Sequence, residues 1–129
     1  MYRETNPHSL GVPNHEGEVI VEKLNRHTFY SFISAGDRVV EFSAQWCFDC
    51  KRLRLSLPEL ENRYASAFRF GELDVDEARE IAESLGVKGV PTFIVFRDGR
   101  EWGRLPAKDA RKEKNLTPFF DRMSYKSPA

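Results

Sequence analysis

The stretch WCFDC, residues 46–50, decides the fold of this chain. It contains the chain's two cysteines, Cys47 and Cys50, separated by two residues. Such a pair can be a redox-active dithiol, half of a zinc site, or buried apolar packing. The sequence on either side of the pair distinguishes these possibilities.

A predicted strand before the motif and a predicted helix after it favour the dithiol. RVVEFSA, residues 38–44, is a mostly apolar run, typical of a strand buried on both faces. From Cys47 to about Ala65, apolar side chains recur at helical spacing. Cys47 therefore lies at a helix N-terminus, where unpaired N–H groups and the helix dipole stabilise a thiolate. Cys50, one turn deeper on the apolar side, is expected to stay shielded and protonated.

The histidines do not complete a metal site. A closed structural zinc site needs four ligands, and His8, His15 and His27 lie at scattered positions. We therefore expect no metal and no cofactor, apart from a redox-active disulfide between Cys47 and Cys50.

The rest of the chain alternates strand and helix patterns in the order βαβαβαββα. This order predicts an α/β fold with a central mixed β-sheet flanked by helices on both faces. The expected domain covers residues 18–124, with an irregular arm at 1–17 and a flexible tail at 125–129. The strands are expected at 18–24, 38–44 and 68–76 and on either side of the Asp98-Gly99 hairpin signal, and the helices at 27–36, 47–65, 77–85 and 115–123.

Length and charge limit the possible partners. The 129 residues fit one domain, and 20 basic residues balance 20 acidic ones, so nothing global favours nucleic acid or an anionic membrane. No apolar run is long enough to span a bilayer, and the first residues lack the apolar segment of a secretory signal. We expect a cytoplasmic protein, and in that compartment a CxxC is catalytic or metal-binding more often than structural.

WCFDCK at 46–51 and GVKGVPT at 86–92 together resemble the thioredoxin family. The LDVD strand end at 73–76 and the hairpin signal add to the resemblance, which covers about residues 18–124. It implies the thioredoxin fold and thiol–disulfide exchange.

The resemblance also implies roles for individual residues. Cys47 would be the nucleophile and Cys50 the resolving thiol, while Trp46 would shield the pair and contact substrate. Pro91 would be a cis-proline opposite the disulfide, with the backbone edge at Val90 free to pair with an extended partner chain.

Two acidic residues are assigned in the same way. Glu41, six residues before Cys47, matches a buried acid that exchanges the proton of the resolving cysteine, Cys50. Glu72 lies where family members often carry a lysine beside this acid. If the two carboxylates approach, one should keep its proton at pH 7. For each residue separately, the alternative is a position on the surface.

The loop between the cysteines departs from the family, because Phe48 and Asp49 replace the usual Gly-Pro. We expect Phe48 to be exposed and to contact partners. Asp49 suits the helix dipole but raises the cost of a thiolate at Cys47. Alternatively, Asp49 is a solvated residue near Arg52.

Three further features concern structure. Pro58 predicts a kink or break near Arg54–Leu57, and Asp76 is the expected N-cap of the helix at 77–85. The basic segment 104–114 is expected to be irregular and either to select acidic partners or to form a solvated surface, with Pro106 lining part of the substrate groove.

The resemblance implies a monomeric thioredoxin-like protein-disulfide reductase with disulfide-containing protein substrates. Its electrons would come from a thioredoxin-reductase-like partner or a small thiol. Val90 before the proline resembles the reducing members of the family, which favours reduction over oxidation. The alternatives are a dedicated reductant of one partner, such as a peroxiredoxin, and a redox-sensing binding module with the thioredoxin fold. The presence of the CxxC, Trp46 and Pro91 together favours an enzyme.

Overall fold

The computed structural model describes residues 19–125. The predicted arm at 1–17 lies outside the described residues, as does the predicted tail except for Tyr125. Within the described part of the chain, no helix is long and apolar enough to cross a membrane.

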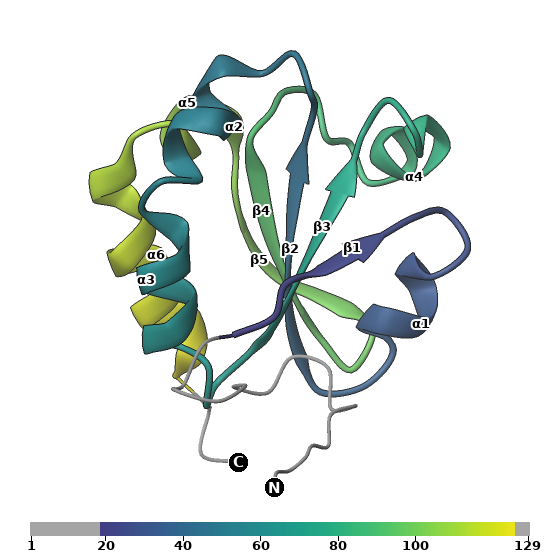
Figure 1. Ribbon diagram of the computed structural model, residues 1–129. Coiled ribbons are helices and arrows are strands. Elements are labelled where there is room, and N and C mark those ends of the chain that lie inside the picture. Colours follow the sequence, from purple (N-terminus) through teal and green to yellow (C-terminus); the bar gives the residue numbers. More distant parts are fainter. Residues whose placement is uncertain (1–18, 126–129) are drawn as a thin grey trace, which may run out of the picture.

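Five strands form one mixed sheet in the order β1-β3-β2-β4-β5, as Figure 1 shows. β1, β3 and β2 run parallel, β4 is antiparallel to β2, and β5 is antiparallel to β4. The predicted mixed α/β sheet is therefore confirmed. The strands are β1 (Glu22–Leu24), β2 (Asp37–Ser43), β3 (Arg69–Asp74), β4 (Thr92–Arg97) and β5 (Arg100–Leu105).

Helices cover both faces of the sheet (Figure 1). α1 (Phe29–Ile33) and α4 (Arg79–Ser84) lie on one face, and α3 (Leu57–Arg63) and α6 (Leu116–Ser124) lie on the other. α2 (Phe48–Leu53) begins just past the carboxyl end of β2. The short helices α5 (Ala107–Ala110) and η2 (Glu113–Asn115) lead from β5 to α6.

Each face has its own apolar core. On the α3/α6 face the buried ring of Phe120 lies within 5.6–6.4 Å of five other aromatic rings, centroid to centroid. On the α1/α4 face the ring of Phe29 packs edge-on against Phe42 and Phe96. Such edge-to-face packing adds to the stabilisation from apolar burial. The five rings around Phe120 are those of Tyr64, Phe68, Phe70, Phe93 and Phe119.

The hairpin and the helix break form where the sequence predicts them. Asp98 and Gly99 both have positive φ, 52° and 86°, as a two-residue hairpin turn of type I′ requires. The helix predicted from Cys47 to Ala65 is divided: α2 ends at Leu53 and α3 begins at Leu57. Pro58 lies in the first turn of α3, where its missing N–H costs no helical hydrogen bond.

Two local predictions are wrong. The segment 104–114 is not irregular, because it contains the end of β5, all of α5 and part of η2. In α5 the N–H of the buried Ala110 bonds the carbonyl of Pro106, and alanine is the best helix former. Asp76 does not cap α4; instead the Asp74 carboxylate accepts the N–H groups of Asp76 and Glu77 ahead of that helix.

Candidate active site

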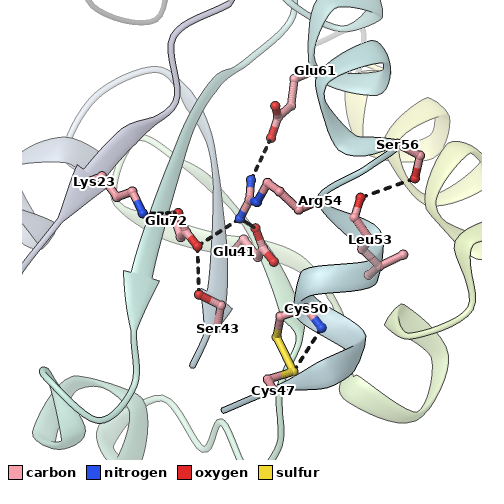
Figure 2. A network of polar contacts seen from close by, with 10 residues as sticks. All are labelled: Lys23, Glu41, Ser43, Cys47, Cys50, Leu53, Arg54, Ser56, Glu61 and Glu72. Atoms are coloured by element: carbon pink, nitrogen blue, oxygen red, sulfur yellow. Dashed lines mark hydrogen bonds and ion pairs between the residues drawn. A yellow bond between two sulfur atoms is a disulfide. The ribbon is translucent and has the colours of Figure 1, made fainter. Parts of the chain in front are cut away.

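The two cysteines lie at the junction between β2 and α2. Cys47 is the N-cap of α2, with an extended backbone, and Cys50 lies one turn into the helix. A disulfide joins them, and the backbone N–H of Cys50 donates a hydrogen bond to Cys47 Sγ at 3.1 Å (Figure 2). An N–H group directed at this sulfur stabilises negative charge on it. Both cysteines are buried in the oxidised protein.

The residues beside Cys47 are among the most exposed large apolar side chains described. Trp46 is 69% exposed and Phe48 is 75% exposed. The indole N–H of Trp46 donates a hydrogen bond to Asp76 Oδ2 at 2.8 Å, which fixes the ring beside the motif. The expectation that Phe48 is exposed is confirmed. Exposed aromatic side chains beside a reactive pair are suited to contact a protein partner.

Val90 and Pro91 directly precede β4, and Val90 lies beside the two cysteines. The peptide bond between them is cis. Val90 packs against a small cluster formed by Ala44, Cys47 and Cys50. The structure thus brings together the segments 46–50 and 90–91, which are forty residues apart in the sequence.

Asp49 is held by a neighbour on its own helix. Arg52 Nη2 donates to Asp49 Oδ1 at 2.8 Å and to the carbonyl of Arg111 at 2.7 Å. The contact with Arg52 is the one that the alternative interpretation of Asp49 anticipated. The same guanidinium fastens α2 to the segment that follows α5, so part of the basic segment 104–114 packs beside the active-site helix.

Glu41 is buried inside the protein, which excludes the surface alternative. It lies on β2, is 4% exposed, and its Oε1 accepts a hydrogen bond from Arg54 Nη2 at 2.7 Å. Burial raises the pKa of Glu41 to about 7, although Arg54 opposes this change. A carboxyl with such a pKa can give or accept a proton near neutral pH.

Glu72 lies opposite Glu41 on β3, in parallel register. Its Oε2 accepts hydrogen bonds from Arg54 Nη2 at 2.9 Å and Ser43 Oγ at 3.0 Å, and its Oε1 lies 3.2 Å from Lys23 Nζ. Burial disfavours the ionised form of Glu72, but the hydrogen bonds and cations outweigh it and lower its pKa. Both carboxylates bind Arg54, which lies between them (Figure 2). The approach that the hypothesis required is therefore present, and a cation accompanies it.

Arg54 and Glu61 also belong to the site, and the sequence did not lead us to predict either. Glu61 on α3 is 6% exposed, and its Oε2 lies 4.0 Å from Arg54 Nη1. Burial raises the pKa of Glu61 to about 7. A signal existed: Leu57, Leu60, Glu61 and Tyr64 share the spacing of one helical face, which places Glu61 among inward-facing residues.

A pocket of about 310 Å³ opens beside this network and reaches the disulfide. Cys50, Ser43, Arg54 and Glu72 are among the residues that line it. In residues 19–125, no group of three or more His, Cys, Asp or Glu side chains is arranged to hold a metal ion. The site therefore consists of a disulfide, an apolar rim and a buried acid–arginine network.

Comparisons with known proteins agree with this geometry. The family model described as Thioredoxin matches residues 20–122. The chain belongs to the thioredoxin family. Members of this family are disulfide oxidoreductases, and this thioredoxin-family protein is a thiol–disulfide oxidoreductase that acts through its CxxC disulfide.

Individual relatives and structures show how far the similarity extends. The thioredoxin of Chlamydia caviae is 36% identical over 86 residues, which are 67% of this chain and 83% of the relative. Oxidised mitochondrial thioredoxin 3 from Saccharomyces cerevisiae superposes with a TM-score of 0.69 at 30% identity, over 79% of this chain and 94% of that one. A chain from a structural study of thiol resolution in yeast mitochondrial 1-Cys peroxiredoxin superposes equally well, with a TM-score of 0.69 at 29% identity, over 79% of this chain and 94% of that one.

Proposed function

We propose that this protein reduces disulfide bonds in protein partners, with Cys47 as the nucleophile and Cys50 as the resolving thiol. The observation that supports this assignment is the hydrogen bond from the Cys50 N–H to Cys47 Sγ. In the reduced protein, this donor and the N-cap position favour a thiolate at Cys47 over one at Cys50. Val90 before the proline, as in reducing family members, supports reduction as the direction.

The exchange proceeds in two steps. The Cys47 thiolate attacks one sulfur of the substrate disulfide, forms a mixed disulfide and releases the first substrate thiolate. Cys50 then loses its proton, attacks Cys47 Sγ and releases the second substrate thiolate. The substrate gains two electrons, and the protein loses them as the Cys47–Cys50 disulfide forms.

Glu41 is the base that we assign to the second step. Its burial and its pKa of about 7 support the assignment, because a group of this kind can take the Cys50 proton at neutral pH. Asp49, beside Cys47, and Glu72, beside Glu41, adjust the local charge.

The surface that receives the substrate consists of Trp46, Phe48, Val90 and Pro91. The two exposed rings provide apolar contact area, and an extended segment of the partner would pair with the backbone edge at Val90. The partners are therefore proteins with accessible disulfides. The proposed active form is a monomer. A thioredoxin-reductase-like enzyme or a small thiol returns the electrons.

A second candidate function is the dedicated reduction of a peroxiredoxin. It is favoured by the structural similarity to the chain from the 1-Cys peroxiredoxin study. In this case the chemistry at Cys47 is the same and the substrate range is narrower.

The test is an insulin-reduction assay with either thioredoxin reductase or dithiothreitol as donor, with Cys47→Ser as the control. We expect turnover with both donors and none with the variant. Turnover of a peroxiredoxin with negligible insulin reduction would select the second candidate. A reversible disulfide without turnover of either substrate would contradict both and indicate a redox-sensing binding module.

A further inference from the structure

Arg54 contacts three carboxylates that come from three different elements. One of its terminal nitrogens, Nη2, binds Glu41 Oε1 on β2 and Glu72 Oε2 on β3, and the other, Nη1, lies 4.0 Å from Glu61 Oε2 on α3. Arg54 is the C-cap residue of α2, at the break between α2 and α3. A guanidinium has several donors in one plane, so it can bind all three groups at once.

The two oxygens of Glu41 differ in their surroundings. Oε1 accepts the hydrogen bond from Arg54, whereas Oε2 is buried and has no hydrogen-bond partner within residues 19–125. In Figure 2 the Glu41 carboxyl lies on the side of the Arg54 guanidinium that faces the disulfide. A buried oxygen without a donor favours the protonated carboxyl, because a carboxylate there would lack a partner.

We propose that Arg54 is a positioning residue for proton transfer: it holds Oε1 of Glu41 and leaves Oε2 as the oxygen that exchanges a proton with Cys50. This inference rests on the base role proposed above for Glu41. The new element is Arg54, which lies outside both the CxxC motif and the sheet and which orients the Glu41 carboxyl.

The proton transfer is balanced as follows. Cys50 Sγ–H gives its proton to Glu41 Oε2, directly or across one water molecule. The electron pair left on Cys50 forms the bond to Cys47 Sγ, and the bond between Cys47 and the substrate sulfur breaks. The substrate leaves as a thiolate. The proton then passes from Glu41 to solvent through the pocket that Cys50, Arg54 and Glu72 line.

The charged groups around Glu41 determine whether a substitution raises or lowers its pKa. Arg54 favours its ionised form, while burial and the negative charges of Glu72 and Glu61 favour the protonated form. Lys23 on β1 affects Glu41 through its ion pair with Glu72. Cys50 on α2 lines the same pocket as Arg54 and Glu72. Phe93 on β4, which pairs with Glu41, is apolar and adds no charge. Removal of Arg54 and removal of the Glu72 charge should therefore move the titration of Glu41 in opposite directions.

The experiment follows the Glu41 side-chain carboxyl carbon by ¹³C NMR as a function of pH in the oxidised, full-length protein. The midpoint should lie near pH 7 in the wild type. In Arg54→Met it should rise by roughly 1–3 pH units, the usual effect of one nearby opposite charge. In Glu72→Gln it should fall, and in Arg54→Lys, which keeps the charge but loses the planar donor set, the rise should be smaller than in Arg54→Met.

Two comparisons make the result decisive. Arg26→Met removes an exposed arginine that pairs with Glu80, and it should leave the Glu41 midpoint unchanged. Because Glu72→Gln retains Arg54, it tests the network even if Arg54→Met does not fold. An unchanged midpoint in Arg54→Lys and Glu72→Gln would overturn the proposal.

Single-turnover reduction of a mixed disulfide provides the second readout. The pH midpoint of the rate should follow the NMR midpoints of the folded variants. It should rise in Arg54→Lys and fall in Glu72→Gln. If the midpoints move but the profile does not, the base role of Glu41 fails, whereas Arg54 still controls its titration. If insulin is not reduced by the wild type at all, the proposed function fails while the NMR result stands independently.

Discussion

The backbone N–H of Cys50 donates to the Sγ of Cys47, and because this donor belongs to the backbone, substitution of the Cys50 side chain leaves it in place. In Cys50→Ser, Cys47 should therefore remain acidified, with a pKa below the ~8.5 of a free cysteine. Measurement of the alkylation rate of Cys47 by iodoacetamide across pH checks this value. A midpoint at or above 8.5 would contradict the stabilising role of the N-cap position.

The same variant should trap the partner. Without a resolving thiol, Cys50→Ser stops at the mixed disulfide, which a non-reducing gel and mass spectrometry detect. Cys47→Ser should form no such adduct and should lose insulin reduction entirely. An adduct in Cys47→Ser but not in Cys50→Ser would reverse the assigned roles.

The buried Glu41 should make stability depend on pH. Its pKa is about 7 when folded, against an ordinary value of 4.5, so the folded state binds the proton more tightly. This contribution to stability is complete below about pH 4.5 and is lost as the pH rises through 7. Glu41→Gln lacks the titration, so its free energy of unfolding relative to the wild type should increase by about 3 kcal/mol between pH 4 and pH 8.

Urea denaturation at several pH values measures this change. Glu59→Gln, an exposed substitution on α3, is the matched control, and the pH-dependent change should be clearly larger for Glu41→Gln than for this variant. If the two variants show equal changes, the Glu41 carboxyl does not titrate as described.

Phe48 should act on substrate binding and not on the chemistry. Because its ring is exposed, Phe48→Ser should change stability by less than about 0.5 kcal/mol. The KM for insulin should rise about fivefold, the loss of one significant interface contact, with kcat retained. A small aromatic disulfide should be reduced at the wild-type rate, and Tyr30→Ser, an exposed ring on α1, is the control. Equal KM values for Phe48→Ser and Tyr30→Ser would show that Phe48 is not a partner contact.

Phe120 should be the most costly aromatic side chain to remove. It is fully buried, and its ring lies among five others. Phe120→Ala should lower the free energy of unfolding by about 3–5 kcal/mol, the usual cost of such a cavity. Phe120→Leu, which leaves a smaller cavity, should cost less. Denaturation in urea measures both, and similar midpoints for Phe120→Ala and the wild type would contradict this description of the core.

The fold was predictable because its signals are local. Asp98-Gly99 predicts a hairpin turn, and Pro58 predicts a helix break. The spacing of apolar residues changes from that of a strand to that of a helix at Cys47. Each of these depends on the backbone conformation of a few neighbouring residues, and each matches the structure.

The charged network was only half predictable. Glu41 stood out as an acidic residue within an apolar strand, and Glu61 could have been found on the inward face of its helix. The position of Arg54 could not be foreseen, because it depends on how the α2–α3 break sits against the sheet. The failure of the predicted Asp76 cap has a similar reason. The Asp76 carboxylate accepts the indole N–H of Trp46, which is a tertiary contact, and the Asp74 carboxylate accepts the N–H groups of Asp76 and Glu77.

The network around Arg54 affects the supply of protons for reduction of the disulfide. Arg54 and Lys23 carry two positive charges, and Glu41, Glu61 and Glu72 carry three negative ones when all are ionised. The group is electroneutral when it holds one proton, which Glu41 or Glu61 can carry near pH 7. Conversion of a disulfide to two thiols consumes two electrons and two protons. Near pH 7 this network can therefore hold one proton beside the pocket that Cys50 lines, and reduction of the disulfide needs two.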